Sequence, residues 1–176
     1  MAILFDTANL RIRSFSSEDA VKLYTIHSES AVKKWIPNES YADLNEAESA
    51  AAFYAGCAGE GILPFVAAVE LKETGELIGD VGINDVSGDP SAVEIGYVIS
   101  QEYSCNGYAT ELLHGMTEYV FSRFDINILY GRVLRGNDAS VRVLEKNGFA
   151  FTKEEADAED DPYGCGVLVY QKRRDI

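Results

Sequence analysis

A single carboxylate stands in the middle of an apolar, strand-like run. The run is AVEIGYVI, residues 92–99, and the carboxylate belongs to Glu94. Alternate side chains of a strand share a face, so Glu94 points the same way as Gly96 and Val98. A carboxylate in a half-buried cleft has a raised pKa and can accept a proton during a reaction. Glu94 is therefore our candidate general base; the alternative is a glutamate that faces solvent or forms a salt bridge.

The segment SCNGYA, residues 104–109, connects that run to a helical pattern. The first turn of a helix carries unpaired backbone N–H groups and a partial positive charge. Gly107 permits unusual dihedrals and a close approach of the backbone to a ligand. Together these features favour a phosphate or pyrophosphate, although strand–glycine–helix turns are common.

Other reactive side chains have simpler interpretations. Cys105 at a helix N-terminus could have a lowered thiol pKa, but no histidine or other base is near it in sequence. We therefore interpret Cys105 as a small side chain that fills the loop. His27 lies on the apolar stripe of a helical pattern, at the edge of the core, and His114 is expected at the surface. The three cysteines have no metal-ligand spacing, so we predict no metal site.

The elements that must position these residues follow from hydrophobic periodicity and turn signals. Strand patterns occupy residues 8–15, 63–71, 76–85, 92–99, 126–134, 149–155 and 164–172, and helical patterns occupy residues 16–30, 43–58, 108–123 and 137–148. This order predicts an α+β domain on a mixed sheet. The strand–helix–strand unit over residues 92–134 should be a right-handed parallel crossover, and a ligand can enter where such strands diverge.

Local patterns define the faces and ends of some elements. In residues 8–15, Leu10 and Ile12 alternate with Arg11 and Arg13, which predicts a half-exposed strand. WIPNESY, which follows the first helical pattern, is typical of a loop. The last helical pattern should stop at Asn147–Gly148 in left-handed backbone.

The composition limits the class of protein. A length of 176 residues suits one domain, and 47% hydrophobic with 25% charged residues is ordinary for a globular protein. No apolar run approaches the roughly 18 residues of a membrane span, and no signal-peptide pattern opens the chain. The odd cysteine count indicates reduced thiols, so we expect a cytoplasmic protein. A net charge of −14 disfavours binding to nucleic acid and favours cationic substrates. The alternative is that this charge only keeps the protein in solution.

Four segments, in order, resemble the GNAT superfamily (GCN5-related N-acetyltransferases) and more narrowly its RimJ/RimL-like branch of protein N-terminal acetyltransferases. They are NLRIRSFSSEDA, ELIGDVGI, VEIGYVISQEYSCNGYATELL and NDASVRVLEKNGF. The resemblance spans residues 8–172, so we expect residues 1–176 to form a single GNAT acetyltransferase domain. It is specific for the fold and the coenzyme and says little about the acceptor.

The resemblance implies a mixed central sheet with splayed parallel strands flanked by helices, and acetyl-CoA as acyl donor in the V between those strands. Backbone groups of Gly96–Ile99 would pair with the pantetheine arm, and N–H groups of Asn106–Ala109 would hold the pyrophosphate. In the last matching segment, Asn137 and Ser140 would lie near the thiol or the pantetheine arm, and Arg142 and Lys146 would reach the 3′-phosphate. The coenzyme-binding residues implied in this way are Gly96, Tyr97, Val98, Ile99, Cys105, Asn106, Gly107, Tyr108, Ala109, Thr110, Asn137, Ser140, Arg142 and Lys146.

Two departures from the family pattern concern the loop and the acid. The family usually has Gly where this chain has Cys105. Many members have a Tyr that would protonate the leaving thiolate, where this chain has Leu144. The RimL-like branch suggests Ser140 as a catalytic hydroxyl instead; the alternative is a helix-surface serine that bonds its own backbone. Tyr97, Tyr108 and Tyr170 remain possible substitutes.

The acceptor side is less defined. The resemblance places Trp35 and Tyr41 with Glu94 as substrate-binding residues. The acidic block EEADAEDD, residues 154–161, is either a solvated loop or an attractor for a cationic substrate.

The activity implied is direct acetyl transfer to a primary amine within a ternary complex. Glu94 would accept the proton, and backbone N–H groups near Tyr97–Val98 would stabilise the oxyanion. The acceptor is either a protein N-terminal α-amine, with a pKa near ~8, or a small amine. The alternative is a non-catalytic acyl-CoA-binding protein with a degraded site. We expect a monomer or a homodimer.

Overall fold

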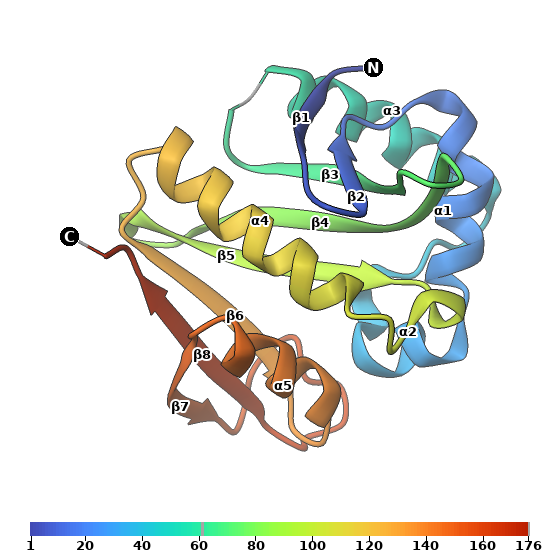
Figure 1. Cartoon of the computed structure of the whole chain (residues 1–176). Helices are drawn as coiled ribbons and strands as arrows, with labels where there is room; N and C mark the ends of the chain where they lie inside the picture. The colour runs from blue at the N-terminus through green and yellow to red at the C-terminus, as the bar shows by residue number, and fades with distance from the viewer. Residues whose placement is uncertain (61, 176) are drawn as a thin grey trace.

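The computed structural model describes residues 1–60 and 62–175, which form an eight-stranded sheet flanked by helices (Figure 1). The strands are β1 (Ile3–Asp6), β2 (Leu10–Arg13), β3 (Phe65–Leu71), β4 (Glu76–Val86), β5 (Asp89–Ile99), β6 (Ile128–Leu134), β7 (Ala150–Glu155) and β8 (Val167–Arg173). The helices are α1 (Ala20–His27), α2 (Ser30–Trp35), α3 (Leu44–Glu60), α4 (Tyr108–Arg123) and α5 (Asp138–Lys146), with 3-10 turns η1 (Ser17–Asp19), η2 (Pro37–Glu39) and η3 (Gln101–Tyr103). None of the helices in these ranges is long and apolar enough to cross a membrane.

The sheet has the mixed topology that the sequence predicts. Its strand order is β1-β2-β3-β4-β5-β6-β8-β7, and the described neighbours are antiparallel except for β5 and β6, which run parallel. The crossover between β5 and β6 contains α4. The N-terminus of α4 therefore lies beside the carboxyl end of β5. The α+β class with a mixed sheet is thereby confirmed.

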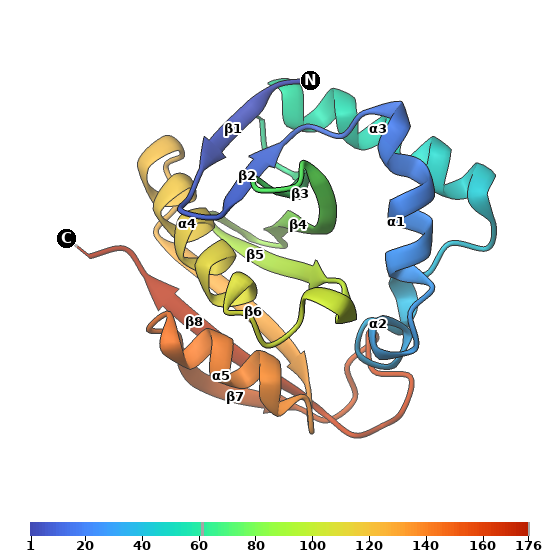
Figure 2. The same cartoon turned by 45° about the vertical axis from the view of Figure 1, so that its right-hand side comes forward.

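Helices cover both faces of the sheet (Figure 2). Leu112, Leu113 and Met116 of α4 are fully buried in one core cluster, which includes Val93 and Ile95 of β5. A second cluster joins α1, α2 and α3 to the other face, where it includes Val98 of β5. The alternation along β5 therefore separates an α4 face from an α1 face.

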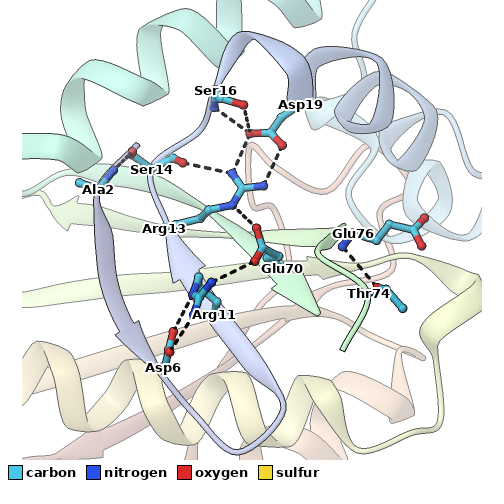
Figure 3. Close-up of polar contacts among 10 residues, drawn as sticks. All are labelled: Ala2, Asp6, Arg11, Arg13, Ser14, Ser16, Asp19, Glu70, Thr74 and Glu76. Atoms are coloured by element: carbon cyan, nitrogen blue, oxygen red, sulfur yellow. Dashed lines mark hydrogen bonds and ion pairs between the residues drawn. The ribbon is translucent and has the colours of Figure 1, made fainter. Parts of the chain in front are cut away.

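Arg13 differs from the sequence expectation of a half-exposed strand. It is only 4% exposed, and its guanidinium donates to Asp19 of η1 at 2.8 Å and to Glu70 of β3 at 2.7 Å (Figure 3). Its neighbour Arg11 stays near the surface, beside Asp6. Alternation alone predicts that the Arg13 side chain is exposed. It is buried because two carboxylates from other elements offset the cost of removing its charge from water.

A helix that the sequence suggests over residues 16–30 is divided in the structure. The chain leaves helical geometry at Glu29, and α2 begins after it. The Glu29 carboxylate accepts hydrogen bonds from Ser100 Oγ at 2.6 Å and from the Gln101 backbone N–H at 2.7 Å. This contact ties α2 to the end of β5. Strand β1 and helix α2 were not expected from the sequence.

Candidate active site

Strands β5 and β6 separate after a short parallel contact. They pair only over residues 92–94 and 128–130, although β5 continues to Ile99 and β6 to Leu134. Figure 1 shows the two strands leaving one end of the sheet together and diverging toward the other. Within the described residues, the outer half of β5, residues 95–99, pairs with β4 on one edge. Its other edge faces β6 and pairs with no strand in those residues; we call this the inner edge.

A cavity of about 790 Å³ occupies this opening, within the range of small-molecule sites. Its walls come from α2 and η2, the outer half of β5, the loop before α4, β6 and α5. The sequence-predicted residues that line it are Trp35, Glu94, Gly96, Tyr97, Val98, Ile99, Cys105, Gly107, Tyr108, Ala109, Thr110, Asn137, Ser140, Arg142 and Lys146. The structure thus brings together residues from three parts of the sequence that are far apart: Trp35, residues 94–110 and residues 137–146.

Two sequence-predicted residues are not part of this wall. The Asn106 side chain donates to the backbone oxygens of Tyr103 and Ser104, at 3.2 Å and 3.1 Å, and so stabilises its own loop. The centroid of the Tyr41 ring lies 5.1 Å from that of the His27 ring, and Tyr41 packs against the core cluster formed with α1, α2 and α3. Local sequence could not place Tyr41, because the path of the chain after η2 depends on those packing contacts.

Glu94 lies where β5 and β6 diverge, and its side chain is 35% exposed. Its carboxylate is 3.8 Å from Nε of Arg132. Burial raises the pKa of Glu94, and the carboxylates of Asp160, Glu155 and Glu39 raise it further, against the opposing charge of Arg132. A half-buried carboxyl with a raised pKa is what a general base near neutral pH requires.

Arg132 on β6 organises the acidic side of the cavity and was missed by the sequence reasoning. Its guanidinium binds Asp160 at 2.8 Å and 3.2 Å and Glu155 at 2.5 Å. The loop between β7 and β8 is thereby fixed at the cavity wall. The register of β6 brings Arg132 there, since it stands two residues beyond Tyr130, which pairs with Glu94.

Glu39 of η2 was also missed, although it lies in the segment expected on the acceptor side. It lines the cavity, and burial raises the pKa of its carboxyl. Its backbone oxygen lies 2.6 Å from Nδ1 of His27, whose Nε2 lies 2.7 Å from an Asp80 carboxylate oxygen. His27 is 2% exposed, so it anchors η2 from beneath and does not reach the cavity.

The loop before α4 has the geometry of an anion cradle. Gly107 is the N-cap of α4 with φ +84°, and Cys105 has φ +63°. Among the non-glycine residues in the described ranges, only Cys105 has a positive φ. Left-handed backbone favours glycine, the residue that the family resemblance led us to expect here. The first turn of α4 therefore presents its unpaired N–H groups to the cavity.

Helix α5 supplies the facing wall. The Asn137 side chain caps the helix by accepting the Ser140 N–H at 3.3 Å. Ser140, Arg142 and Lys146 line the cavity, and the two cations stand one turn apart. Leu144 is 2% exposed and packs against Gly131, where an added Cβ would come within 2.6 Å of Leu144 Cδ2. The position at which the family resemblance led us to expect a Tyr is thus an apolar core position.

Family comparison agrees with this geometry. The family model described as "Acetyltransferase (GNAT) domain" matches residues 9–150. The chain belongs to the GNAT acetyltransferase family. The uncharacterized N-acetyltransferase YoaA of Bacillus subtilis (strain 168) is 29% identical over 148 residues, which cover 83% of this chain and 82% of YoaA. The protein is accordingly an acetyltransferase of the GNAT family.

Solved structures share the fold. RimL, named as a ribosomal L7/L12 alpha-N-protein acetyltransferase in complex with coenzyme A, superimposes with a TM-score of 0.82, at 17% identity and 97% coverage of both chains. A chimera of the spermidine N-acetyltransferase SpeG from Vibrio cholerae and hSSAT has a TM-score of 0.78 at 18% identity, covering 94% of this chain and 96% of the chimera. These two GNAT structures are named for different acceptors, so the fold alone does not select one.

Proposed function

We propose that this GNAT enzyme uses acetyl-CoA to acetylate a primary amine. The observation that carries the proposal is the open inner edge of β5, with Glu94 at its start and the first turn of α4 at its end. One extended donor can lie along that edge, with its acyl group near Glu94 and its phosphates near α4.

The residues present fit such a donor. Backbone groups of residues 96–99 have no strand partner on the inner edge in the described structure, so they are free to pair with an extended pantetheine arm. An added Cβ at Gly96 or Gly107 would meet no atom within 4 Å, so the backbone is accessible at both positions. Arg142 and Lys146 supply positive charge on the facing wall.

Glu94 prepares the acceptor by removing a proton, directly or through a water. An ammonium has no lone pair, so the amine must lose a proton before or during attack. An α-amine has a pKa near ~8, closer to neutrality than the ~10.4 of a lysine amine, and needs less help from the base.

The charges beside Glu94 select against acceptors that carry a carboxylate next to the amine. Glu39, Glu94 and Asp160 all line this end of the cavity, and Arg132 is already bound to Asp160 and Glu155. A free amino acid would place its carboxylate among these groups. A peptide N-terminus, or a small amine without a neighbouring carboxylate, avoids this repulsion.

The test is thiol release from acetyl-CoA in the presence of three acceptor panels: N-terminal peptides, polyamines and free amino acids. We expect release with one of the first two panels and little with the third. Preference for amino acids would contradict the charge argument. CoA binding without any acceptor-dependent release would instead support a non-catalytic acyl-CoA-binding protein.

A further inference from the structure

A three-residue turn, η3, joins the inner edge of β5 to the loop before α4. Gln101 and Tyr103 of this turn line the cavity. The donor that we propose would contact residues 96–99 on one side of η3 and residues 106–109 on the other. The conformation of η3 therefore sets the spacing and the angle between two places that one donor must contact together.

Two carboxylates from other parts of the chain hold η3. The carboxylate of Glu29, between α1 and α2, accepts hydrogen bonds from Ser100 Oγ at 2.6 Å and from Gln101 N–H at 2.7 Å. Ser100 is the N-cap of η3, but its own side chain does not cap the turn, so Glu29 takes the role of the cap. At the other end of η3, the Tyr103 hydroxyl donates to Glu76 at 2.5 Å.

The contacts of Glu29 continue into the loop that follows η3. The Asn106 side chain donates to the backbone oxygens of Tyr103 and Ser104, which connects the loop to the turn. Ser100 is only 2% exposed, so solvent does not readily replace Glu29 as the partner of its hydroxyl. One continuous set of hydrogen bonds therefore leads from the Glu29 carboxylate to the residues directly before α4.

We propose that Glu29 is a positioning residue for the acyl donor: it fixes η3 so that the inner edge of β5 and the first turn of α4 can bind one donor at the same time. This inference rests on the proposed function. Glu29 is not among the described residues that line the cavity, so it acts through Ser100 and Gln101 and not by touching the donor. A ligand that spans two sites gains affinity from both only where their spacing is held in advance.

The test compares a ligand that spans η3 with one that does not. We would measure dissociation constants for CoA and for adenosine 3′,5′-bisphosphate, which carries the nucleotide end of CoA without the pantetheine arm. In Glu29→Ala, CoA should bind roughly tenfold more weakly, whereas the affinity for the bisphosphate should change less than about twofold. Ser100→Ala removes one of the two hydrogen bonds and should weaken CoA binding about threefold. Glu29→Gln keeps an oxygen that can accept from Gln101 N–H, so it should restore part of the loss.

Arg13→Ala separates positioning from a general loss of stability. It breaks buried ion pairs on β2, outside the cavity wall, so it should lower the unfolding temperature while CoA affinity stays at the wild-type value.

Three results would overturn the inference: equal weakening of CoA and the bisphosphate in Glu29→Ala, wild-type CoA affinity in folded Glu29→Ala, or weakened CoA binding in Arg13→Ala as well. If Glu29→Ala does not fold, the same comparison of the two ligands in Ser100→Ala decides. A wild-type protein that binds neither ligand would refute the proposed function itself.

Discussion

At the residue scale, Glu94 combines an unfavourable environment for its charge with the chemical use that we propose for it. Because burial raises its pKa in the fold, Glu94 binds a proton more readily in the folded than in the unfolded state. Its ionisation then reduces stability as pH rises above its ordinary value of about 4.5. A group that costs stability while facing a cavity is typical of a functional position.

Glu94→Gln should therefore lose activity without losing stability. We expect kcat to fall by roughly 10²–10⁴-fold at neutral pH, with a smaller deficit at higher pH, where more of the amine is already deprotonated. The unfolding free energy at neutral pH should equal or exceed that of wild type. Glu39→Gln removes a carboxylate of the same cavity and should reduce kcat less. A Glu94→Gln enzyme with wild-type turnover between about pH 6 and pH 9 would assign the base elsewhere.

Cys105 gives a second residue-scale prediction. Its left-handed backbone costs about 1 kcal/mol for a non-glycine residue. Cys105→Gly removes this strain but adds freedom to the unfolded chain, so stability in urea should be unchanged or higher by up to ~1 kcal/mol. Ser104→Gly, at an extended backbone position, should lose about 0.5–1 kcal/mol. Loss of activity in a folded Cys105→Gly protein would show that the thiol has a chemical role.

At the element scale, buried ion pairs connect β2 to its neighbours. Arg13→Ala leaves the carboxylates of Asp19 and Glu70 without their buried cation and should cost about 3–5 kcal/mol in urea unfolding. Arg11→Ala on the same strand removes an arginine at the surface and should cost less than about 1 kcal/mol. Equal losses in the two variants would show that burial of Arg13 is not what couples these elements.

His27 joins α1, β4 and η2 in a pH-dependent manner. Both ring nitrogens face oxygens, so the doubly protonated ring donates to Glu39 O and to Asp80. Burial alone would lower the pKa of His27, but the bond to Asp80 and its charge raise it overall. This stabilisation is complete below the unfolded value of about 6.5 and is lost as pH rises through the raised folded value.

Unfolding free energies measured at several pH values from about 6 upward would test this interpretation. Wild type should lose stability over this range, and His27→Gln should show a clearly smaller decline. His114→Gln, at an exposed position of α4, should retain the wild-type decline. A wild-type slope in His27→Gln would rule out His27 as the titrating group.

Elements defined by local signals were predicted well from the sequence. The bounds of α4 agree with its apolar stripe, and α5 ends at Lys146, followed by Asn147 as its C-cap and by Gly148 with φ +78°. The break at Glu29 and the burial of Arg13 were not predictable, because their causes are partners far away in the chain. The end of an element can be predicted from sequence where local backbone geometry determines it. It cannot be predicted where hydrogen bonds to distant residues determine it.

At the scale of the whole molecule, the site is a consequence of topology. The residues that we propose for the donor side could be predicted from the sequence because they lie in one contiguous motif, from the end of β5 into α4, and in a second at α5. Arg132 and Glu39 were missed because their proximity to Glu94 depends on the β5–β6 register and on the path of η2. Those relations are set by packing of the complete sheet with α1 and α4.

Hydrogen exchange with and without saturating CoA tests most directly whether the opening between β5 and β6 is the donor site. A donor on the inner edge of β5 should slow exchange at amides of residues 96–99 and 106–109, because they gain hydrogen-bond partners. Amides of β7, on the outer edge of the sheet, should exchange as before. Protection confined to other elements, or none at saturating CoA, would contradict the placement of the donor.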